Sequence, residues 1–525
     1  MYAIDLFCGA GGFSEGIIQS GFHILFSSDR SPHVMETYIN RHEQLGLIHG
    51  QNTHFELADI RELTGEDILA KINQLSDFRD TPFGVGDIDV IFGGPPCQGF
   101  SRAGKRDPND PRNMLFREYL RIISEIQPKY VVMENVSGFM DTRLTNFISL
   151  TNGFTYEIDT LVSDILQNEL QLLGYNVLQP RLLDASDYGV PQKRKRAIFI
   201  AYRNGQEEPH YPEPITSEPH EKVTVLQAIG DLVDGVDLNN VDMEYINQSR
   251  LGRTPNIHGL PIEGGDFLHN HETSAHSLSV RERFAMFRPG ESTRVLANRI
   301  INEGIDLRSY PNLLMECLFN ANKDPNKNIL ANIAQQMGLR VNINSNLWLV
   351  NTLKLIAQIN VNEQTEGRNT VETLINGKLS ARLGCNSEEA LLFYEQCRTR
   401  LNSSYTLENI IDAFLTGNVD EHLIKSLLTN KNSRIKLNIH STSPTMLTLP
   451  DDFINPFEQR ILTVREMARL QSFDDSFQFL GKRTTGGDLR AQEVPQYTQV
   501  GNAVPPLLAK AIASQIALAL KGVTV

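Results

Sequence analysis

The chain has 525 residues, of which 40% are hydrophobic and 21% are charged, and its formal net charge is −14. This composition is typical of a globular protein with room for two or more domains. No run of about 18 apolar residues is present, so no membrane span is indicated, and the first residues lack the basic and apolar regions of a secretory signal. The five cysteines form no CxxC pair, so we expect no disulfide framework, no metal site and a reducing, cytoplasmic location.

Positive charge is concentrated in two segments of this acidic chain. Residues 192–203 carry five lysines and arginines and no acid, and residues 281–299 carry five arginines against two glutamates. Because phosphate contacts depend on local rather than net charge, both segments are compatible with nucleic-acid binding. An ordinary solvated surface is an equally good interpretation of either segment taken alone.

Short apolar runs alternate with helical patterns over residues 1–204. The runs that have the length and composition of buried strands are 3–7, 23–26, 88–92, 130–133 and 196–201. Strands separated by helical patterns predict an α/β fold with a mostly parallel sheet.

Beyond this region the pattern changes. Residues 207–220 are rich in Pro and Glu and resemble a linker, and residues 251–289 predict irregular or β-rich structure. Residues 298–432 predict helices, and we expect the single tryptophan, Trp348, to be a core residue there. Residues 507–520 predict a C-terminal helix with a wide apolar face, which follows two prolines that suit a helix start. Because that face needs a sheet to cover, we expect the C-terminus to return to the first domain.

A glycine-rich loop, Phe7-Cys8-Gly9-Ala10-Gly11-Gly12, follows the first predicted strand. Its glycines allow a tight turn and a close approach of the backbone to a ligand. Asp29 lies 20 residues after Gly9, at the end of the second strand, a spacing that suits a carboxylate accepting hydrogen bonds from ribose hydroxyls. Ser14 stands where a nicotinamide-dinucleotide site requires its third glycine, so the loop departs from that fingerprint. A plain strand–helix turn remains the alternative.

A cysteine and a glutamate each follow a predicted strand. Glu134 follows residues 130–133, and Cys97 follows residues 88–92 in the turn Gly93-Gly94-Pro95-Pro96-Cys97-Gln98-Gly99-Phe100-Ser101. The carboxyl ends of parallel strands meet at one edge of a sheet, so we expect both side chains to converge on the loop at Gly9. The alternatives, taken one at a time, are a buried packing cysteine and an ordinary loop glutamate.

The basic segment Gln192-Lys193-Arg194-Lys195-Arg196 precedes a further predicted strand. In an extended backbone, Gln192, Arg194 and Arg196 project to the same side. A cation on that side would favour the thiolate form of a nearby cysteine. A solvated basic run is the alternative.

In this order, these motifs resemble those of the cytosine-5 DNA methyltransferases of bacterial restriction-modification systems. The resemblance covers residues 3–203 and 462–520, where the segments Ile461–Phe473 and Gln499–Pro506 are similar to the later motifs of the family. It implies a class I S-adenosylmethionine-dependent methyltransferase fold, which is Rossmann-like with a mostly parallel sheet, together with a second, target-recognition domain that carries a helical insertion.

The resemblance implies that the following residues are catalytic: Cys97, Glu134, Asn135, Gln192, Arg194 and Arg196. Cys97 would bond to C6 of the cytosine, which makes C5 nucleophilic toward the methyl group of S-adenosylmethionine. Glu134 would act at N3 of the ring, and Arg196 would stabilise the ring oxygen. Arg194 would support the loop that carries the cysteine, and Gln192 would help to hold the base.

The residues that the resemblance assigns to the cofactor are Phe7, Gly9, Ala10, Gly11, Gly12, Asp29, Arg30, Asp59, Ile60, Pro95, Asn502 and Val504. Asp59 would accept a hydrogen bond from the adenine amino group, and Ile60 would cover the ring, although a helix cap is an alternative role for Asp59. Arg30 stands where the family has an aromatic residue, and a guanidinium group can also stack on a ring.

The family places its target-recognition region between the Gln-x-Arg-x-Arg and Arg-Glu motifs. The resemblance therefore divides the chain into a catalytic and cofactor-binding domain (1–204), a target-recognition domain (205–460) with a helical insertion (about 298–432), and a hinge with the C-terminal return (461–525). The implied partner is double-stranded DNA, from which the target cytosine is flipped out. A monomeric enzyme is expected. The resemblance is also compatible with a cognate restriction endonuclease that acts separately.

Three alternatives stay open at this point. A transfer-RNA cytosine-5 methyltransferase would share the catalytic loop, but the long segment 205–460 favours an enzyme that reads a duplex. A catalytically silent nucleic-acid-binding relative is opposed by the intact Cys97, Glu134 and Arg196. A nicotinamide-dependent dehydrogenase is opposed by Ser14 in the glycine-rich loop.

Overall fold

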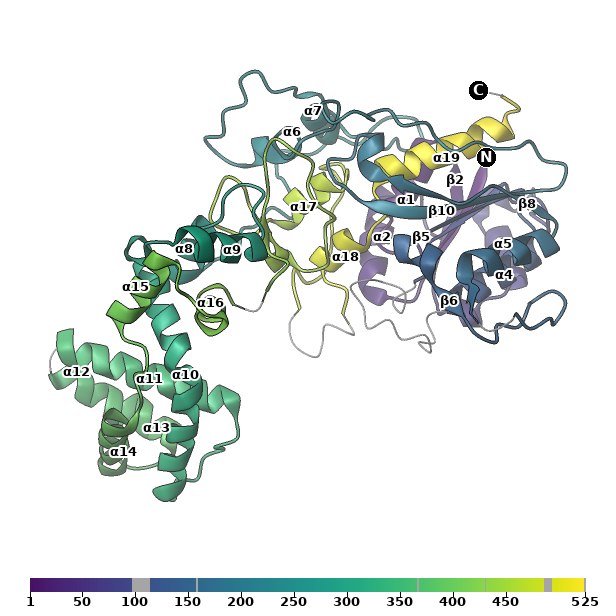
Figure 1. Cartoon of the computed structure of the whole chain (residues 1–525). Coiled ribbons are helices and arrows are strands. Elements are labelled where there is room, and N and C mark those ends of the chain that lie inside the picture. Colours follow the sequence, from purple (N-terminus) through teal and green to yellow (C-terminus); the bar gives the residue numbers. More distant parts are fainter. Residues whose placement is uncertain (97–113, 157–158, 366–367, 430, 486–492, 524–525) are drawn as a thin grey trace. The chain divides into compact units, whose positions relative to one another are not determined.

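The structure, a computed structural model, describes residues 1–96, 114–156, 159–365, 368–429, 431–485 and 493–523. The chain forms two compact units (Figure 1). The first contains Met1–Ser274 and Leu437–Val525, and the second contains Ala275–Lys436. The first unit is an α/β structure and the second is built almost entirely of helices, so the two are described separately.

A single twisted sheet forms the centre of the first unit, in the strand order β3-β2-β1-β4-β5-β10-β8, with β9 also paired to β10. The strands are β1 (Tyr2–Leu6), β2 (His23–Asp29), β3 (His54–Leu57), β4 (Val90–Gly93), β5 (Tyr130–Val136), β8 (Tyr175–Val177), β9 (Arg181–Asp184) and β10 (Lys195–Arg203). The pairs among β1 to β5 are parallel, whereas β10 runs antiparallel to β5, β8 and β9. The expected α/β fold with a mostly parallel sheet is therefore confirmed.

Alternate residues of the central strands face two separate hydrophobic layers, as the two-residue repeat of a strand requires. Ile4, Ile91 and Val131 pack on one side with helices α3 (Gly65–Asn73), α4 (Leu115–Ile126) and α5 (Val162–Leu172). Their neighbours Ala3, Val90 and Val132 pack on the other side with α1 (Gly12–Gln19) and α19 (Pro506–Leu520). The sheet is thus covered by helices on both faces, which is why its strands read as continuous apolar runs.

The C-terminal helix α19 lies directly against α1, the first helix of the chain (Figure 1). Gly16 makes this approach possible, because a Cβ atom there would lie 2.3 Å from the backbone nitrogen of Lys510. Gly12 serves the same purpose at the start of α1, where a Cβ atom would lie 2.4 Å from the carbonyl oxygen of Val504. The residues that follow Asn502 are therefore held beside the glycine-rich loop.

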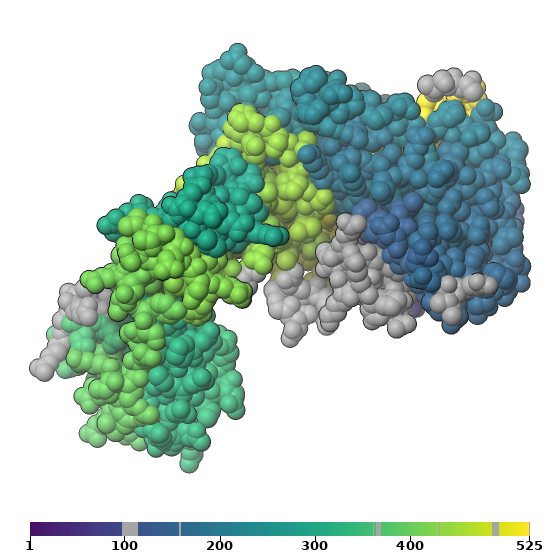
Figure 2. Space-filling view, in the orientation of Figure 1, coloured from purple at the N-terminus to yellow at the C-terminus, as the bar shows by residue number. Residues whose placement is uncertain are grey.

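Two segments that the resemblance assigns to target recognition, residues 205–274 and 437–460, belong to the first compact unit. The elements of these segments and of the chain that follows them are α6 (Val225–Ile229), α7 (Glu244–Leu251), β12 (Phe453–Ile454), α17 (Val464–Leu470) and α18 (Gln496–Asn502). The yellow-green surface near residues 450–480 abuts the blue-teal surface near residues 205–270 (Figure 2).

Buried ion pairs join residues 205–274 to α17 and to the residues that follow it. Arg469 binds Asp475 (Nε to Oδ1, 2.7 Å) and Asp231 (Nη1 to Oδ1, 2.9 Å). Arg253 binds Asp474 (Nη1 to Oδ1, 2.7 Å). Separating the segments would leave these charges buried without their partners, which is strongly destabilising. The ion pairs therefore hold the segments together. The first compact unit therefore does not end at the change in composition near residue 204 but continues to Ser274.

Helices of the second unit pack around their own hydrophobic cluster, to which Leu353, Ile359, Leu379 and Phe393 contribute. The helices are α8 (Leu278–Ala285), α9 (Thr293–Glu303), α10 (Pro311–Gln336), α11 (Asn346–Thr365), α12 (Arg368–Thr373), a π-helical turn η8 (Leu374–Leu379), α13 (Ser380–Leu383), α14 (Ser387–Arg400), α15 (Leu407–Thr416) and α16 (Glu421–Leu428). The predicted helical stretch 298–432 is helical and begins earlier than predicted. Trp348 packs against the cluster but is only partly buried.

In the described part of the chain, no single helix is both long and apolar enough to cross a membrane. The bent pair α18 and α19 satisfies that criterion together, by length and composition only. The described cysteines form no disulfide, and the described residues contain no group of three His, Cys, Asp or Glu side chains suited to a metal ion.

Candidate active site

The glycine-rich loop begins where β1 ends and closes onto the end of β2. Its backbone turns sharply, with positive φ angles of 59° at Phe7 and 55° at Gly9. The Gly9 N–H donates to Oδ2 of Asp29 (3.1 Å), and the Ser31 N–H donates to Oδ1 (2.8 Å). Burial nevertheless raises the pKa of Asp29, because these two hydrogen bonds only partly replace its hydration. The carboxylate is thereby fixed beside the loop.

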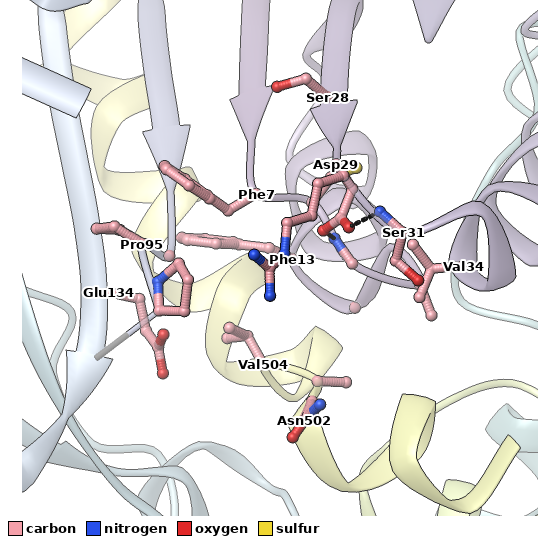
Figure 3. A pocket seen from close by; sticks show the side chains of 18 of the residues that line it. Phe7, Phe13, Ser28, Asp29, Ser31, Val34, Pro95, Glu134, Asn502 and Val504 are labelled. Atoms are coloured by element: carbon pink, nitrogen blue, oxygen red, sulfur yellow. Dashed lines mark hydrogen bonds between the residues drawn. The ribbon is translucent and has the colours of Figure 1, made fainter. Parts of the chain in front are cut away.

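A cavity of about 400 Å³ opens at the carboxyl ends of the parallel strands. Figure 3 shows Pro95 and Glu134 on one side of it and Asp29 with Ser31 on the other, and Asn502 and Val504 reach it from the C-terminal segment. Ligands of open α/β sheets bind at this edge, and the volume suits a small-molecule cofactor. The predicted residues that line the cavity are Phe7, Gly9, Ala10, Gly12, Asp29, Arg30, Asp59, Ile60, Pro95, Glu134, Asn135, Arg196, Asn502 and Val504.

Gly11, which was also assigned to the cofactor, is not among the lining residues. It adopts a φ of 98° just before α1, a conformation that side chains rarely tolerate. A Cβ atom at this position would lie 3.3 Å from the ring of Tyr38. Gly11 thus allows the loop to turn and to pack against Tyr38, without facing the cavity.

The predicted adenine end of the cavity is formed by Asp59 and Ile60. Asp59 caps the short helix η1 (Ile60–Glu62) by accepting from the Arg61 N–H, so its alternative role as a helix cap is present. Its carboxylate is also bound by the Arg61 guanidinium (2.6 Å to Nη2), and these side-chain hydrogen bonds lower the pKa of Asp59 to about 2. Ile60 is buried against the sheet core. Arg30 is exposed and also lines the cavity.

Glu134 and Arg196 form an ion pair at the opposite end of the cavity, with Nε of Arg196 lying 2.6 Å from Oε1 of Glu134. Arg196 pairs with Val136 in the antiparallel ladder of β10 and β5, so Glu134 is its diagonal neighbour on the same face. The prediction that Glu134 follows its strand is wrong in this detail. β10 extends the ladder as far as Val136 and keeps Glu134 inside the strand.

The loop before Cys97 is fastened to β5. The Asn135 side-chain amide donates to the carbonyl oxygen of Pro95 (3.0 Å). A Cβ atom at Gly94 would lie 3.3 Å from Oε2 of Glu134, which leaves little room for a larger residue. Pro95 and Pro96 both line the cavity that contains Glu134. Cys97 itself lies outside the described residues.

Gln192 and Arg194 are not brought to the cavity. The two side chains project to the same side, as the alternation predicts, and both are buried there, whereas Lys193 and Lys195 are exposed. The Arg194 guanidinium donates to the carbonyl oxygens of Met446 (3.1 Å) and Gly501 (2.9 Å). Burial lowers the pKa of Arg194 well below its usual value.

The side chain of Gln192 has a similar role, because it accepts from the Met446 N–H (2.8 Å) and donates to the carbonyl oxygen of Leu470 (3.1 Å). Together with Arg194, this side chain joins β10 to three later segments of the chain. Of the three alternating residues, only Arg196 reaches the cavity.

The donor set fits S-adenosylmethionine, the cofactor that the resemblance implies. Asp29 offers a fixed carboxylate to ribose hydroxyls, and the Gly9 position leaves space, since nothing lies within 4 Å of a Cβ atom built there. The hydroxyl oxygen of Ser31 is buried and finds no hydrogen-bond partner among the described residues, so a polar ligand in the cavity can satisfy it. Apolar walls at Phe7 and Ile60 suit a flat aromatic ring.

Several cavity residues were missed by sequence analysis, among them Ser31, Val34 and Gln499. Ser31 is the N-cap of α2 (Pro32–Gln44), and the pattern of a serine before a proline predicts this position. Gln499 lies within a recognised motif. Its amide oxygen accepts from the Thr37 hydroxyl (2.7 Å) and its nitrogen donates to the carbonyl oxygen of Leu480 (3.1 Å), contacts that no local pattern predicts.

Comparison with known proteins agrees with this geometry. The family model of C-5 cytosine-specific DNA methylases matches residues 1–518. The chain is 25% identical to the Type II methyltransferase M.DdeI of Desulfomicrobium norvegicum, over 98% of this chain and 88% of that protein. It is 26% identical to M.AgeI of Thalassovita gelatinovora, over 99% of this chain and the full length of that protein.

Among solved structures, a protein described as a DNA modification methyltransferase encoded within a prophage (E. coli) shares the fold. Its TM-score is 0.54 at 20% identity, and the match covers 99% of both chains. The match of the family model to nearly the whole sequence establishes that this chain belongs to the C-5 cytosine-specific DNA methylase family.

Proposed function

We propose that Cys97 and Glu134 carry out the reaction of this family, methylation of carbon 5 of cytosine in DNA with S-adenosylmethionine as methyl donor. The observation that carries the proposal is a single cavity. It is lined by the glycine-rich loop with Asp29, by the Glu134–Arg196 ion pair, and by Pro95 and Pro96, which directly precede Cys97. A methyl donor and a pyrimidine can therefore meet at one place.

The chemistry requires a thiolate, since C5 of cytosine is a poor nucleophile on its own. The Cys97 thiolate adds its electron pair to C6, and the electrons of the C5–C6 double bond then make C5 nucleophilic. S-adenosylmethionine, when bound, supplies an electrophilic methyl group on a positively charged sulfur. After C5 has taken the methyl group, loss of the C5 proton to water restores the double bond and releases the thiolate.

The other cysteines support this assignment to Cys97. Burial raises the pKa of Cys8 well above its usual value, and it raises the pKa of both Cys317 and Cys397 to about 12. Cys385 also has a raised pKa, from burial. A thiol with a raised pKa supplies little thiolate, so none of the cysteines in the described ranges is suited to the addition step.

Glu134 is the proposed partner of N3, and Arg196 the proposed partner of the ring oxygen. When Cys97 adds to the ring, negative charge grows on these two ring atoms, and a carboxyl group and a guanidinium are suited to stabilise it. The ion pair of 2.6 Å holds both side chains in place before a base arrives. Asn135 acts indirectly by holding the Pro95 carbonyl, and Gln192 and Arg194 act by holding the segments around Met446 and Gly501.

The substrate is proposed to be a specific double-stranded DNA sequence from which the cytosine is flipped out. The relatives that match over most of their length are named Type II methyltransferases, which favours DNA over transfer RNA. Residues 205–460 are proposed to contain the target-recognition region. We further propose a monomeric, cytoplasmic enzyme with a cognate restriction endonuclease that acts separately.

The test is replacement of Cys97 by serine. Because a hydroxyl is far less nucleophilic than a thiolate, we expect Cys97→Ser to lose methyl transfer to DNA and to retain binding of S-adenosylmethionine in calorimetry. DNA that contains 5-fluorocytosine should trap a covalent adduct with the wild-type protein and none with Cys97→Ser. As a matched control, Cys385→Ser should transfer methyl groups normally. Methyl transfer by Cys97→Ser at the wild-type rate would show that another group adds to the ring.

A further inference from the structure

A groove of about 600 Å³ lies on the surface of the second unit and is lined by residues that belong to no motif of the methylation reaction. One wall is a single stripe of α11. Asn351, Lys354, Leu355 and Gln358 are spaced by three and four residues and therefore lie on one face of the helix. Leu355 is buried against the hydrophobic cluster and forms the floor, whereas Lys354 and Gln358 are exposed.

The other wall comes from the segment that contains the π-helical turn. Lys378, Ala381 and Arg382 repeat the same spacing across η8 and α13, and all three are exposed. Trp348 sets the distance between the walls, because its indole N–H donates to the carbonyl oxygen of Arg382 (3.2 Å). Single π-helical turns occur frequently at functional sites, and here the turn supplies Lys378.

The charge of the groove is unbalanced. The residues that line it include two lysines, one arginine and two side-chain amides but no acid. Within the described ranges, Lys354, Lys378 and Arg382 form no ion pair, and Glu316, the electrostatic neighbour of Lys354, is already bound by Arg283 (2.6 Å).

The basic segment 281–299 differs from the groove, because most of its arginines are neutralised. Arg283 binds Glu316, Arg288 binds Glu303 and Arg299 binds Glu291. The second unit also differs in charge from the chain as a whole. Residues 275–436 carry 19 Lys and Arg against 16 Asp and Glu, although the complete sequence carries 49 against 63. At the groove, three cations that form no ion pair among the described residues line one hollow and are available to an external anion.

We propose that this groove binds the phosphate backbone of duplex DNA without reading its sequence. The inference rests on the proposed function, in which DNA is the substrate. It adds a second DNA contact, at the groove, which is not needed for binding the cytosine in the cavity. Flexible, exposed lysines beside side-chain amides suit the repeated phosphates of a backbone, which carry no sequence information. An enzyme with a net charge of −14 is repelled by DNA, so a local cationic surface raises its affinity and its rate of encounter.

The test uses the full-length protein and an alternating A·T duplex, which contains no cytosine and cannot enter the methylation reaction. Trp348 is the single tryptophan of the chain, so its fluorescence reports on the groove without a label. We expect the duplex to change the Trp348 emission in a saturable way, with an affinity that falls as salt rises. The triple variant Lys354→Gln/Lys378→Gln/Arg382→Gln should lose this change. The log–log slope of affinity against salt should also fall by about two to three, because each neutralised phosphate contributes about 0.9.

A matched control carries the same change of charge in the same unit. Arg308, Arg398 and Lys425 are exposed cations that are each bound to an acid. The variant Arg308→Gln/Arg398→Gln/Lys425→Gln should keep the fluorescence change and the salt slope. If the groove triple variant keeps both as well, while its circular dichroism and melting curve match the wild type, the proposal is overturned. An acidic protein surface would then be the better candidate for the groove.

The outcome is independent of the proposed function. At low salt and saturating cytosine-containing DNA, the groove variant should methylate at the wild-type rate, because none of its substitutions lies in the cavity of Glu134. If the wild-type protein transfers no methyl group to DNA but its Trp348 emission still responds to the duplex, the proposed function is contradicted and the proposed groove is not.

Discussion

The Arg196 guanidinium and the Glu134 carboxylate, 62 positions apart in the chain, lie 2.6 Å from each other across two antiparallel strands. Both side chains are nearly buried, with 11% and 10% of their surfaces exposed. Each therefore determines the orientation of the other, and a base that enters the cavity meets a preorganised carboxyl group and a preorganised cation.

This pair predicts different results for two substitutions. Glu134→Gln should lower the rate of methyl transfer by about 10² to 10⁴-fold, because a positioned acid or base contributes that much. Arg196→Lys should keep the charge but lose the fixed guanidinium fork, with a smaller loss. Single-turnover transfer of a tritiated methyl group measures both, and binding of S-adenosylmethionine should stay unchanged. A wild-type rate for Glu134→Gln would exclude its role at N3.

Asp29 should determine the affinity for the cofactor. Asp29→Asn keeps the shape of the side chain and removes a charged acceptor, whose hydrogen bonds contribute about 1.5–3 kcal/mol. We expect the Kd for S-adenosylmethionine in calorimetry to rise about 10- to 100-fold. Asp80→Asn, at an exposed position of the same unit, is the matched control and should bind normally. Equal affinities for the two variants would remove Asp29 from the cofactor site.

Gly16 should be intolerant of any side chain. In Gly16→Ala, the new methyl group meets the backbone of Lys510 at 2.3 Å and forces α1 and α19 apart. Overpacking of this kind costs about 1–3 kcal/mol or more, which lowers the midpoint of urea unfolding. Gly265→Ala, where nothing lies within 4 Å of the added atom, serves as the control. If both variants unfold alike, the contact between the two helices does not contribute to stability.

The ion pair between Glu15 and Arg41 is buried, with Nε of Arg41 2.8 Å from Oε1 of Glu15, and the Thr254 hydroxyl also donates to Glu15. Arg41→Met leaves the carboxylate buried without its cation and should cost about 3–5 kcal/mol of unfolding free energy. The double variant Arg41→Met/Glu15→Leu should recover most of that loss. A double-mutant cycle in denaturant measures the coupling, and additive effects of the two substitutions would contradict it.

Asp5 should make the stability depend on pH. Burial raises the pKa of Asp5 to about 7, against the hydrogen bond that the Ser14 hydroxyl donates to it. The folded state therefore keeps a proton that the unfolded chain releases near pH 4, so the contribution of Asp5 to stability falls as pH rises from about 4 to about 7 and then levels off.

Asp5→Asn keeps the acceptor for Ser14 and removes the titration. Relative to this variant, the wild-type protein should lose a few kcal/mol between pH 5 and pH 8, as measured by denaturant unfolding at each pH. His42 works in the opposite direction, because burial lowers its pKa to about 3 and its contribution is lost as pH falls below about 6.5. A constant difference between wild type and Asp5→Asn would mean that the carboxyl group is ionised throughout.

Much of the cavity follows from local pattern. The apolar runs at 3–7 and 130–133 lie largely within strands β1 and β5, and the glycine-rich loop and Asp29 lie together as their spacing predicts. Strand formation and a tight glycine turn depend mainly on residues that are close in the chain, so such features can be predicted from the sequence. Alternation likewise predicted that Gln192 and Arg194 project to one side of the chain, and the structure buries both side chains on that side.

What those two residues contact was decided by tertiary packing. Arg194 meets Gly501, 307 positions away, and Gln192 meets Leu470, 278 positions away, so neither enters the cavity. The antiparallel β10 keeps Glu134 inside a strand, and the compact first unit extends to Ser274. No local pattern contains this information. Contacts between distant segments are selected by which buried polar groups can satisfy one another once the whole core has closed around them.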